Sequence, residues 1–170
     1  MSIIYRRASL EMLDWLVSSR IEVLRAANQL GDDVDMRKVA ETSRRYYQEA
    51  LANSSHVGLL AFDGDAFVGA GGISFYKVMP TYHNPSGKKA YIMNMYVRPE
   101  YRRQGIALRM LDMLVTEARD RGITQISLEA TDAGRPLYAH YGFVPMEHEM
   151  ELPEGQTVSD EHGSAYEPSM

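Results

Sequence analysis

The stretch Val97–Ala107 decides the fold, and it reads VRPEYRRQGIA. It joins an apolar run to an amphipathic stretch that begins at Ile106, so we expect it to connect a strand to a helix. The first backbone N–H groups of a helix have no intrahelical acceptor and lie at the positive end of the helix dipole. Gly105 permits a close approach to the main chain, and Arg102 and Arg103 add charge-assisted hydrogen bonds. The stretch predicts an anion site, although taken alone it would also suit a glycine turn with solvated arginines.

The segments on either side of this stretch predict a βαβ unit. The apolar run Ala90–Val97 indicates a strand, and Ile106–Arg121 carries its apolar residues on one helical face before Gly122. The next apolar run, Ile123–Ala130, indicates a second strand. A strand, a helix and a strand in this order favour parallel pairing of the two strands.

The N-terminal half predicts two helices, a hairpin and a long loop. Apolar residues recur at three- and four-residue steps from Ser9, a plausible N-cap, to Leu30, and again from Met36 to Leu51. The hairpin consists of His56–Phe62 and Phe67–Tyr76 around a glycine-containing turn, and the loop is Lys77–Lys89.

The C-terminal part predicts a short helix, a last strand and a tail. Ala133–Tyr141 is the helix and Phe143–Leu152 is the strand, with Pro145 near its beginning. Residues 153–170 are polar and rich in Glu, Ser and Gly, which is typical of segments that do not order by themselves. We therefore expect a domain over residues 1–152 and a polar tail over residues 153–170.

Composition restricts the class of protein. The 170 residues carry 18 Lys and Arg against 23 Asp and Glu, a net charge of −5, and 45% are hydrophobic, which fits one globular domain. An acidic chain without a basic block argues against nucleic-acid binding. The absence of cysteine excludes disulfides, zinc–thiolate sites and a cysteine nucleophile. Residues 1–7 lack a secretory signal and no run of about 18 apolar residues occurs, so we expect a cytoplasmic protein without a membrane partner.

Two other phosphate-binding motifs are excluded. Gly87-Lys88 lacks the glycine of a P-loop, because Tyr82 stands at that position. The glycines Gly69, Gly71 and Gly72 lie inside a strand run instead of between a strand and a helix, so we interpret them as a bulge or as close packing.

The chain resembles the GCN5-related N-acetyltransferase (GNAT) superfamily in two separate motifs. Arg102, Gly105 and Ala107 fit the family's Q/R-x-x-G-x-G/A motif at the start of a helix. About thirty residues later, Leu137–Phe143 fits an apolar residue, Tyr, three residues and Gly-Phe. The resemblance covers about Ile3–Leu152. It implies an α/β (α+β) fold with a mixed sheet of about six to seven strands, about four flanking helices and splayed central parallel strands.

The resemblance also implies acetyl-CoA as co-substrate and no metal. The pyrophosphate would rest on the backbone of residues 103–107, and the pantetheine arm would pair with residues 95–97. A backbone N–H near Met95 or Tyr96 is the implied oxyanion donor. The implied cofactor-binding residues are Met95, Tyr96, Val97, Arg102, Arg103, Gln104, Gly105, Ile106, Ala107 and Tyr138.

Three residues are candidates for the chemistry. Tyr138 lies where many family members place the tyrosine that protonates the CoA sulfur, and a packed aromatic residue is the alternative. Glu129, on the strand after the cofactor helix, is a candidate base, and a solvated carboxylate is the alternative. Asn94 cannot act as a base, but it would orient water or substrate. The sequence does not assign the general base that would accept the proton of the amine.

The expected function is transfer of an acetyl group to a primary amine by direct attack. The acceptor would be a small-molecule or peptide amine, and candidate substrate-binding residues are Tyr46, Tyr82, His83 and Asn84. The alternatives are another acyl group, acylation of a peptide or protein amine, and a non-catalytic acyl-CoA-binding module. Family members are frequently dimers, so the resemblance is also compatible with a homodimer.

Overall fold

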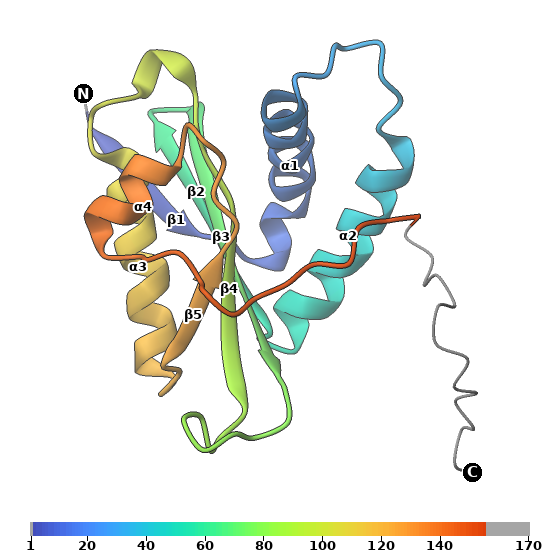
Figure 1. Ribbon diagram of the computed structural model, residues 1–170. Helices are drawn as coiled ribbons and strands as arrows, with labels where there is room; N and C mark the ends of the chain where they lie inside the picture. Colours follow the sequence, from blue (N-terminus) through green and yellow to red (C-terminus); the bar gives the residue numbers. More distant parts are fainter. Residues whose placement is uncertain (1, 156–170) are drawn as a thin grey trace.

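The structure is a computed structural model that describes residues 2–155 (Figure 1). In chain order the strands are β1 (Ile3–Arg7), β2 (His56–Asp63), β3 (Ala66–Lys77), β4 (Lys88–Val97) and β5 (Gln125–Leu128). The helices are α1 (Leu13–Asn28), α2 (Arg37–Ala52), α3 (Ile106–Asp120) and α4 (Arg135–Tyr141), with short 3₁₀ turns at Leu10–Met12 and Pro99–Tyr101. Within this part of the chain, each helix is too short or too polar to cross a membrane.

The strands form one mixed sheet in the order β1-β2-β3-β4-β5. Neighbours from β1 to β4 are antiparallel, which confirms the predicted hairpin between β2 and β3. The pair β4–β5 is parallel and α3 connects its strands, so the predicted βαβ unit is also confirmed.

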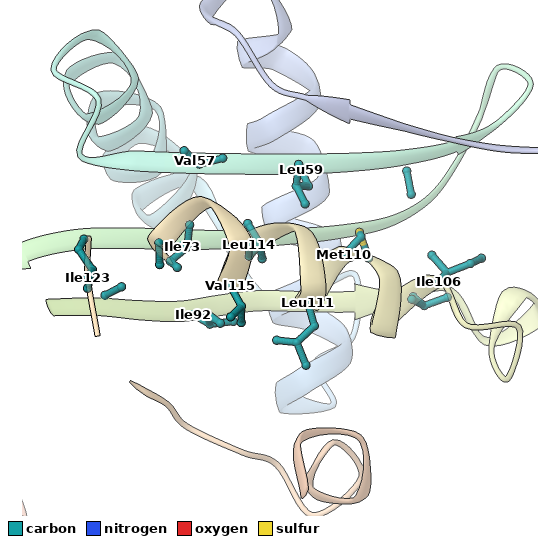
Figure 2. Packing of buried hydrophobic residues seen from close by; sticks show 14 of the residues in the cluster. Val57, Leu59, Ile73, Ile92, Ile106, Met110, Leu111, Leu114, Val115 and Ile123 are labelled. Carbon is teal, nitrogen blue, oxygen red and sulfur yellow. The ribbon is translucent and has the colours of Figure 1, made fainter. Parts of the chain in front are cut away.

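Helices cover both faces of the sheet, with α1 and α2 on one side and α3 and α4 on the other (Figure 1). The apolar residues of α3 recur on one face because three- and four-residue steps align in a helix. Leu111, Leu114 and Val115 thus pack with Ile73 and Ile92 of the sheet, as Figure 2 shows. On the opposite face a second cluster joins α1 and α2 to β2 and β3: Leu16, Val17, Tyr47, Leu60, Phe62, Phe67 and Ala70.

A bulge interrupts β4 where this strand pairs with β3. Gly72 pairs with Met93 but Ala70 pairs with Tyr96, so β4 holds one residue more than β3 across this interval. Asn94 takes up the irregularity with a φ of 61°, a conformation that Asn tolerates better than most residues. A Cβ on the opposing Gly71 would lie 2.9 Å from the sulfur of Met95. The register shift confirms the expected bulge at these strand glycines, and the short distance at Gly71 confirms close packing.

The predicted last strand is wrong in the described structure. The sheet has five strands over residues 2–155, because Phe143–Leu152 pairs with none of them. Pro145 cannot donate a ladder hydrogen bond, and Val144, Met150 and Leu152 are 80%, 96% and 82% exposed. An alternating pattern makes a strand only where a neighbouring strand accepts its backbone groups.

Other boundaries differ by a few residues. The expected strand Ile123–Ala130 is confined to Gln125–Leu128, and Ser9 precedes a 3₁₀ turn without a side-chain capping hydrogen bond. Of the expected tail, residues 156–170 lie outside the described residues.

Candidate active site

The loop between β4 and α3 is anchored at both ends. The backbone N–H of Arg98 donates to the Val68 carbonyl at 2.8 Å, and Pro99 begins a 3₁₀ turn. The Arg102 guanidinium turns back and its Nε donates to the Val97 carbonyl at 2.9 Å. The Tyr101 hydroxyl donates to Asp63 at 3.1 Å, which attaches the turn to the β2–β3 hairpin. These contacts hold the loop against the end of β4 and the β2–β3 hairpin.

The same loop presents a run of backbone donors. Arg103 has a φ of 61° and Gly105 a φ of 81°, and left-handed residues of this kind turn successive N–H groups toward one side. Within residues 2–155, the N–H groups of residues 103–108 meet no protein acceptor. The first helical hydrogen bond runs from the Arg109 N–H to the carbonyl of Gly105, the residue before α3. A Cβ on Gly105 would meet no heavy atom within 4 Å. The loop can hold an anion at the positive end of α3.

An ion pair attaches α1 to the end of β4. The Arg98 guanidinium donates to both carboxylate oxygens of Glu22, at 2.8 and 3.0 Å. This hydrogen bonding lowers the pKa of Glu22. Arg98 also lies over the Phe67 ring, 5.2 Å from its centroid. The pair thus positions α1 beside the loop.

Beyond the bulge, β4 has a free edge. Its parallel pairing with β5 ends at Ile92 and Leu128, so residues 93–97 have no ladder partner on that side within the described chain. The pairing thus ends in the region where the resemblance implies a splay between β4 and β5. Met95, Tyr96 and Val97 lie on this edge, directly before the loop. Asn94 accepts a hydrogen bond on Oδ1 from Arg20 of α1 at 3.0 Å.

Tyr138 lies on α4, near the end of β5. Burial raises its pKa, and its ring packs edge-on with Phe143 at 6.1 Å between centroids. It lines a cavity of about 990 Å³ together with Leu128 and Ala130. A protonated phenol at neutral pH is the form that an acid needs.

A smaller cavity lies between the anion loop and α4. It measures about 470 Å³, and its lining includes Gly105, Arg109 and His140. Tyr141 lines both cavities and its hydroxyl donates to Asp112 on α3 at 2.9 Å. Helix α4 therefore borders the space beside the anion loop as well as the space at the end of β5.

Glu129 follows β5 directly and is exposed. Burial raises the pKa of Tyr91 on β4, and the nearby carboxylate of Glu129 raises it further. The two side chains are therefore neighbours across β4 and β5.

Within residues 2–155, the structure contains no group of three or more His, Asp and Glu side chains that could hold a metal ion.

The structure adds a polar cluster that the sequence reasoning missed. His56 Nδ1 lies 3.1 Å from the Tyr46 hydroxyl and 3.0 Å from Ser74 Oγ, and these two oxygens are 2.7 Å apart. Burial, together with the charge of Arg20, lowers the pKa of His56 to about 4, so the imidazole is neutral. Burial raises the pKa of the neighbouring Tyr47 to about 12. The available signal was a histidine at an alternate position of an apolar strand.

The other predicted substrate residues lie elsewhere. Tyr82 and His83 are on the β3–β4 loop, at the opposite end of β4 from the anion loop (Figure 1). Asn84 is buried and donates to the Lys88 carbonyl at 2.9 Å and to Gln125 Oε1 at 3.2 Å. The structure does not bring these three residues to the β4 bulge, whereas it places Tyr46 in the cluster with His56.

Known proteins share this architecture. A model of the acetyltransferase (GNAT) family matches residues 21–143. A predicted acetyltransferase from Clostridium acetobutylicum, solved with acetyl-CoA, is 36% identical, with a TM-score of 0.81 over 89% of this chain and 96% of that chain. A GCN5-related N-acetyltransferase from Ralstonia eutropha JMP134 is 28% identical, with a TM-score of 0.74 over 89% and 98%. A thialysine N-epsilon-acetyltransferase from Caenorhabditis elegans is 24% identical over 72% of this chain and 74% of that protein.

Proposed function

Because the chain belongs to the acetyltransferase (GNAT) family, we propose that it is an acetyl-CoA-dependent N-acetyltransferase that acts on a primary amine. The observation that carries this proposal is the run of N–H groups from residue 103 to residue 108, before and at the start of α3, which meet no acceptor within residues 2–155. A pyrophosphate would bind there, and the pantetheine amides would pair with the free edge of β4 at Met95–Val97. The remaining loop residues proposed to contact CoA are Arg102, Gln104, Ile106 and Ala107.

The proposed reaction is a direct attack in a ternary complex. The neutral amine nitrogen forms a bond to the thioester carbon, and a backbone N–H near Met95 or Tyr96 stabilises the oxyanion. The C–S bond then breaks, and Tyr138 gives its proton to the departing thiolate. Glu129, directly or through water, takes the proton that the amine loses, and Asn94 orients water or substrate. The products are the amide and free CoA, and proton exchange with solvent returns Tyr138 and Glu129 to their starting forms.

The relatives support the choice of substrates. The similar protein from Clostridium acetobutylicum was solved with acetyl-CoA, and the name of the Caenorhabditis elegans relative specifies an amine of thialysine as its acceptor. An amine on a small molecule or a peptide is therefore the acceptor class that we propose here.

Calorimetric titration tests whether the protein binds acetyl-CoA. Acetyl-CoA, CoA and dephospho-CoA are titrated separately at fixed ionic strength into the wild type and Arg102→Ala. Arg45→Ala is the matched control, since Arg45 is exposed on α2 and pairs with Glu41. We expect saturable binding that Arg102→Ala weakens and Arg45→Ala does not. Absence of binding to all three ligands would overturn the proposal.

A screen of amines tests whether the protein transfers the acetyl group. Thiol release from acetyl-CoA is measured with a panel of small amines and amine-bearing peptides, and mass spectrometry identifies the acetylated product. Amine-dependent release supports the transferase. Saturable binding without release for any amine would instead favour a non-catalytic acyl-CoA-binding module.

A further inference from the structure

Arg20, a cation on α1, lies at the β4 bulge, and no carboxylate of residues 2–155 pairs with it. Leu16 of α1 packs on the sheet at Gly58, where its Cδ2 would lie 3.3 Å from a Cβ at that position. Arg20 is one helical turn further along α1, and its Nη1 reaches Oδ1 of Asn94 at 3.0 Å. Arg20 therefore lies over the segment of β4 where the strand leaves β5.

The acidic residues of the same helix are paired elsewhere. Asp14 pairs with Arg44 at 2.7 Å, and Glu22 pairs with Arg98 at 2.8 Å. Within residues 2–155, no carboxylate oxygen lies within 4.0 Å of the Arg20 guanidinium. A guanidinium has five N–H donors, and the bond to Asn94 uses one of them.

Three groups that the structure places near Arg20 are polar and uncharged, namely Asn94, His56 and Tyr47. The charge of Arg20 acts on His56 and on Tyr47, and His56 is hydrogen-bonded to Tyr46 and Ser74. Arg20 is itself partly buried. A guanidinium that is partly removed from water gains charge-assisted hydrogen bonds from an anion that binds beside it.

We propose that Arg20 binds a carboxylate of the acceptor, so that the substrates are amino-acid-type amines instead of simple polyamines. This inference rests on the proposed function, because it takes the β4 bulge as the place of the reaction. A planar guanidinium matches the two oxygens of a carboxylate, and its one positive charge matches one negative charge. The Tyr46, His56 and Ser74 cluster supplies further neutral hydrogen-bonding partners beside it.

Matched acceptors test this inference. L-Lysine and thialysine are each compared with their carboxamides, which keep the reacting side-chain amine and lack the carboxylate. Amines that carry a phosphate form a third arm. We expect kcat/KM to be roughly tenfold or more higher for each carboxylate than for its carboxamide, the effect of one hydrogen-bonded charged group. In Arg20→Gln the ratio should approach one, whereas Arg45→Gln on α2 should keep it.

Each outcome has a separate meaning. Equal kcat/KM for carboxylates and carboxamides in the wild type would overturn the inference and leave the acetyltransferase intact. A preference for phosphate-bearing amines would also overturn it, as would an equal loss for all acceptors in Arg20→Gln. Failure of acetyl-CoA to bind would mark the failure of the proposed function instead.

Two further measurements keep the test decisive. If Arg20→Gln does not fold, Arg20→Lys retains the charge without the planar fork, and the carboxylate preference should shrink. If no amine is acetylated, calorimetry in the presence of CoA compares the binding of L-lysine with that of L-lysinamide. Tighter binding of L-lysine, lost on substitution of Arg20, supports the inference, and equal binding contradicts it.

Discussion

The substitution Gly105→Ala should lower the stability of the protein modestly and weaken its binding of acetyl-CoA strongly. Gly105 has a φ of 81°, and a Cβ there would meet no heavy atom within 4 Å. The cost in stability therefore comes from the backbone alone, roughly 1–2 kcal/mol for a left-handed residue with a side chain. The added methyl group would occupy the space where a phosphate approaches the N–H groups. Loss of one such charged hydrogen bond, about 1.5–3 kcal/mol, weakens acetyl-CoA binding roughly 10- to 100-fold.

Gly122 provides the matched control at the other end of α3. Its φ is 74°, and a Cβ there would also meet no heavy atom within 4 Å. Gly105→Ala and Gly122→Ala should lower the free energy of unfolding by similar amounts in urea titrations. Only Gly105→Ala should weaken acetyl-CoA binding in calorimetry. If both variants bound acetyl-CoA as tightly as the wild type, or if both lost the same affinity, the assignment of the anion site to this loop would be refuted.

Three further predictions concern the acid, the buried histidine and the strand glycines. Tyr138→Phe should lower kcat at least tenfold, as measured by stopped-flow thiol release, and should change acetyl-CoA affinity by a smaller factor; an unchanged kcat would remove the acid role. His56 binds no proton in the folded state between pH 6.5 and about 4, whereas the unfolded chain does, so stability should fall by up to about 3 kcal/mol as the pH decreases through this window. Urea titrations of the wild type against His56→Gln check this, and the same pH dependence in both proteins would contradict it. Gly69→Ala would place a Cβ 2.8 Å from the Tyr96 carbonyl oxygen, so it should destabilise the protein by roughly 1–3 kcal/mol and weaken acetyl-CoA binding, whereas Gly64→Ala, in the open hairpin turn, should leave that binding unchanged.

The anion loop was predictable because its properties are local. A strand end, a glycine and the start of a helix are consecutive in the chain, and unpaired N–H groups follow from helix geometry alone. The anion loop at residues 97–107 could therefore be predicted without knowledge of distant contacts. The βαβ unit was predictable for the same reason, since the apolar periodicity of α3 differs from that of its flanking strands.

The predicted last strand failed because strand formation is not local. Residues 143–152 alternate as a strand should, but their backbone groups require a neighbour, and β5 offers four residues. The substrate residues show the same limit. Tyr82 and Asn84 lie close to β4 in the sequence, yet a ten-residue strand separates their loop from the anion loop.

The amino-acid sequence alone determined the order of the elements from α1 to α4, the βαβ unit and the position of the anion loop, because periodicity, glycine and helix ends act over neighbouring residues. Only the tertiary structure decided which side chains meet at the β4 bulge. Arg20 of α1, Tyr46 of α2 and His56 of β2 come together there because helices pack across strands that are distant in the chain. The charge balance of Arg20 is likewise a property of that packing, since it depends on where every carboxylate of the surrounding elements lies.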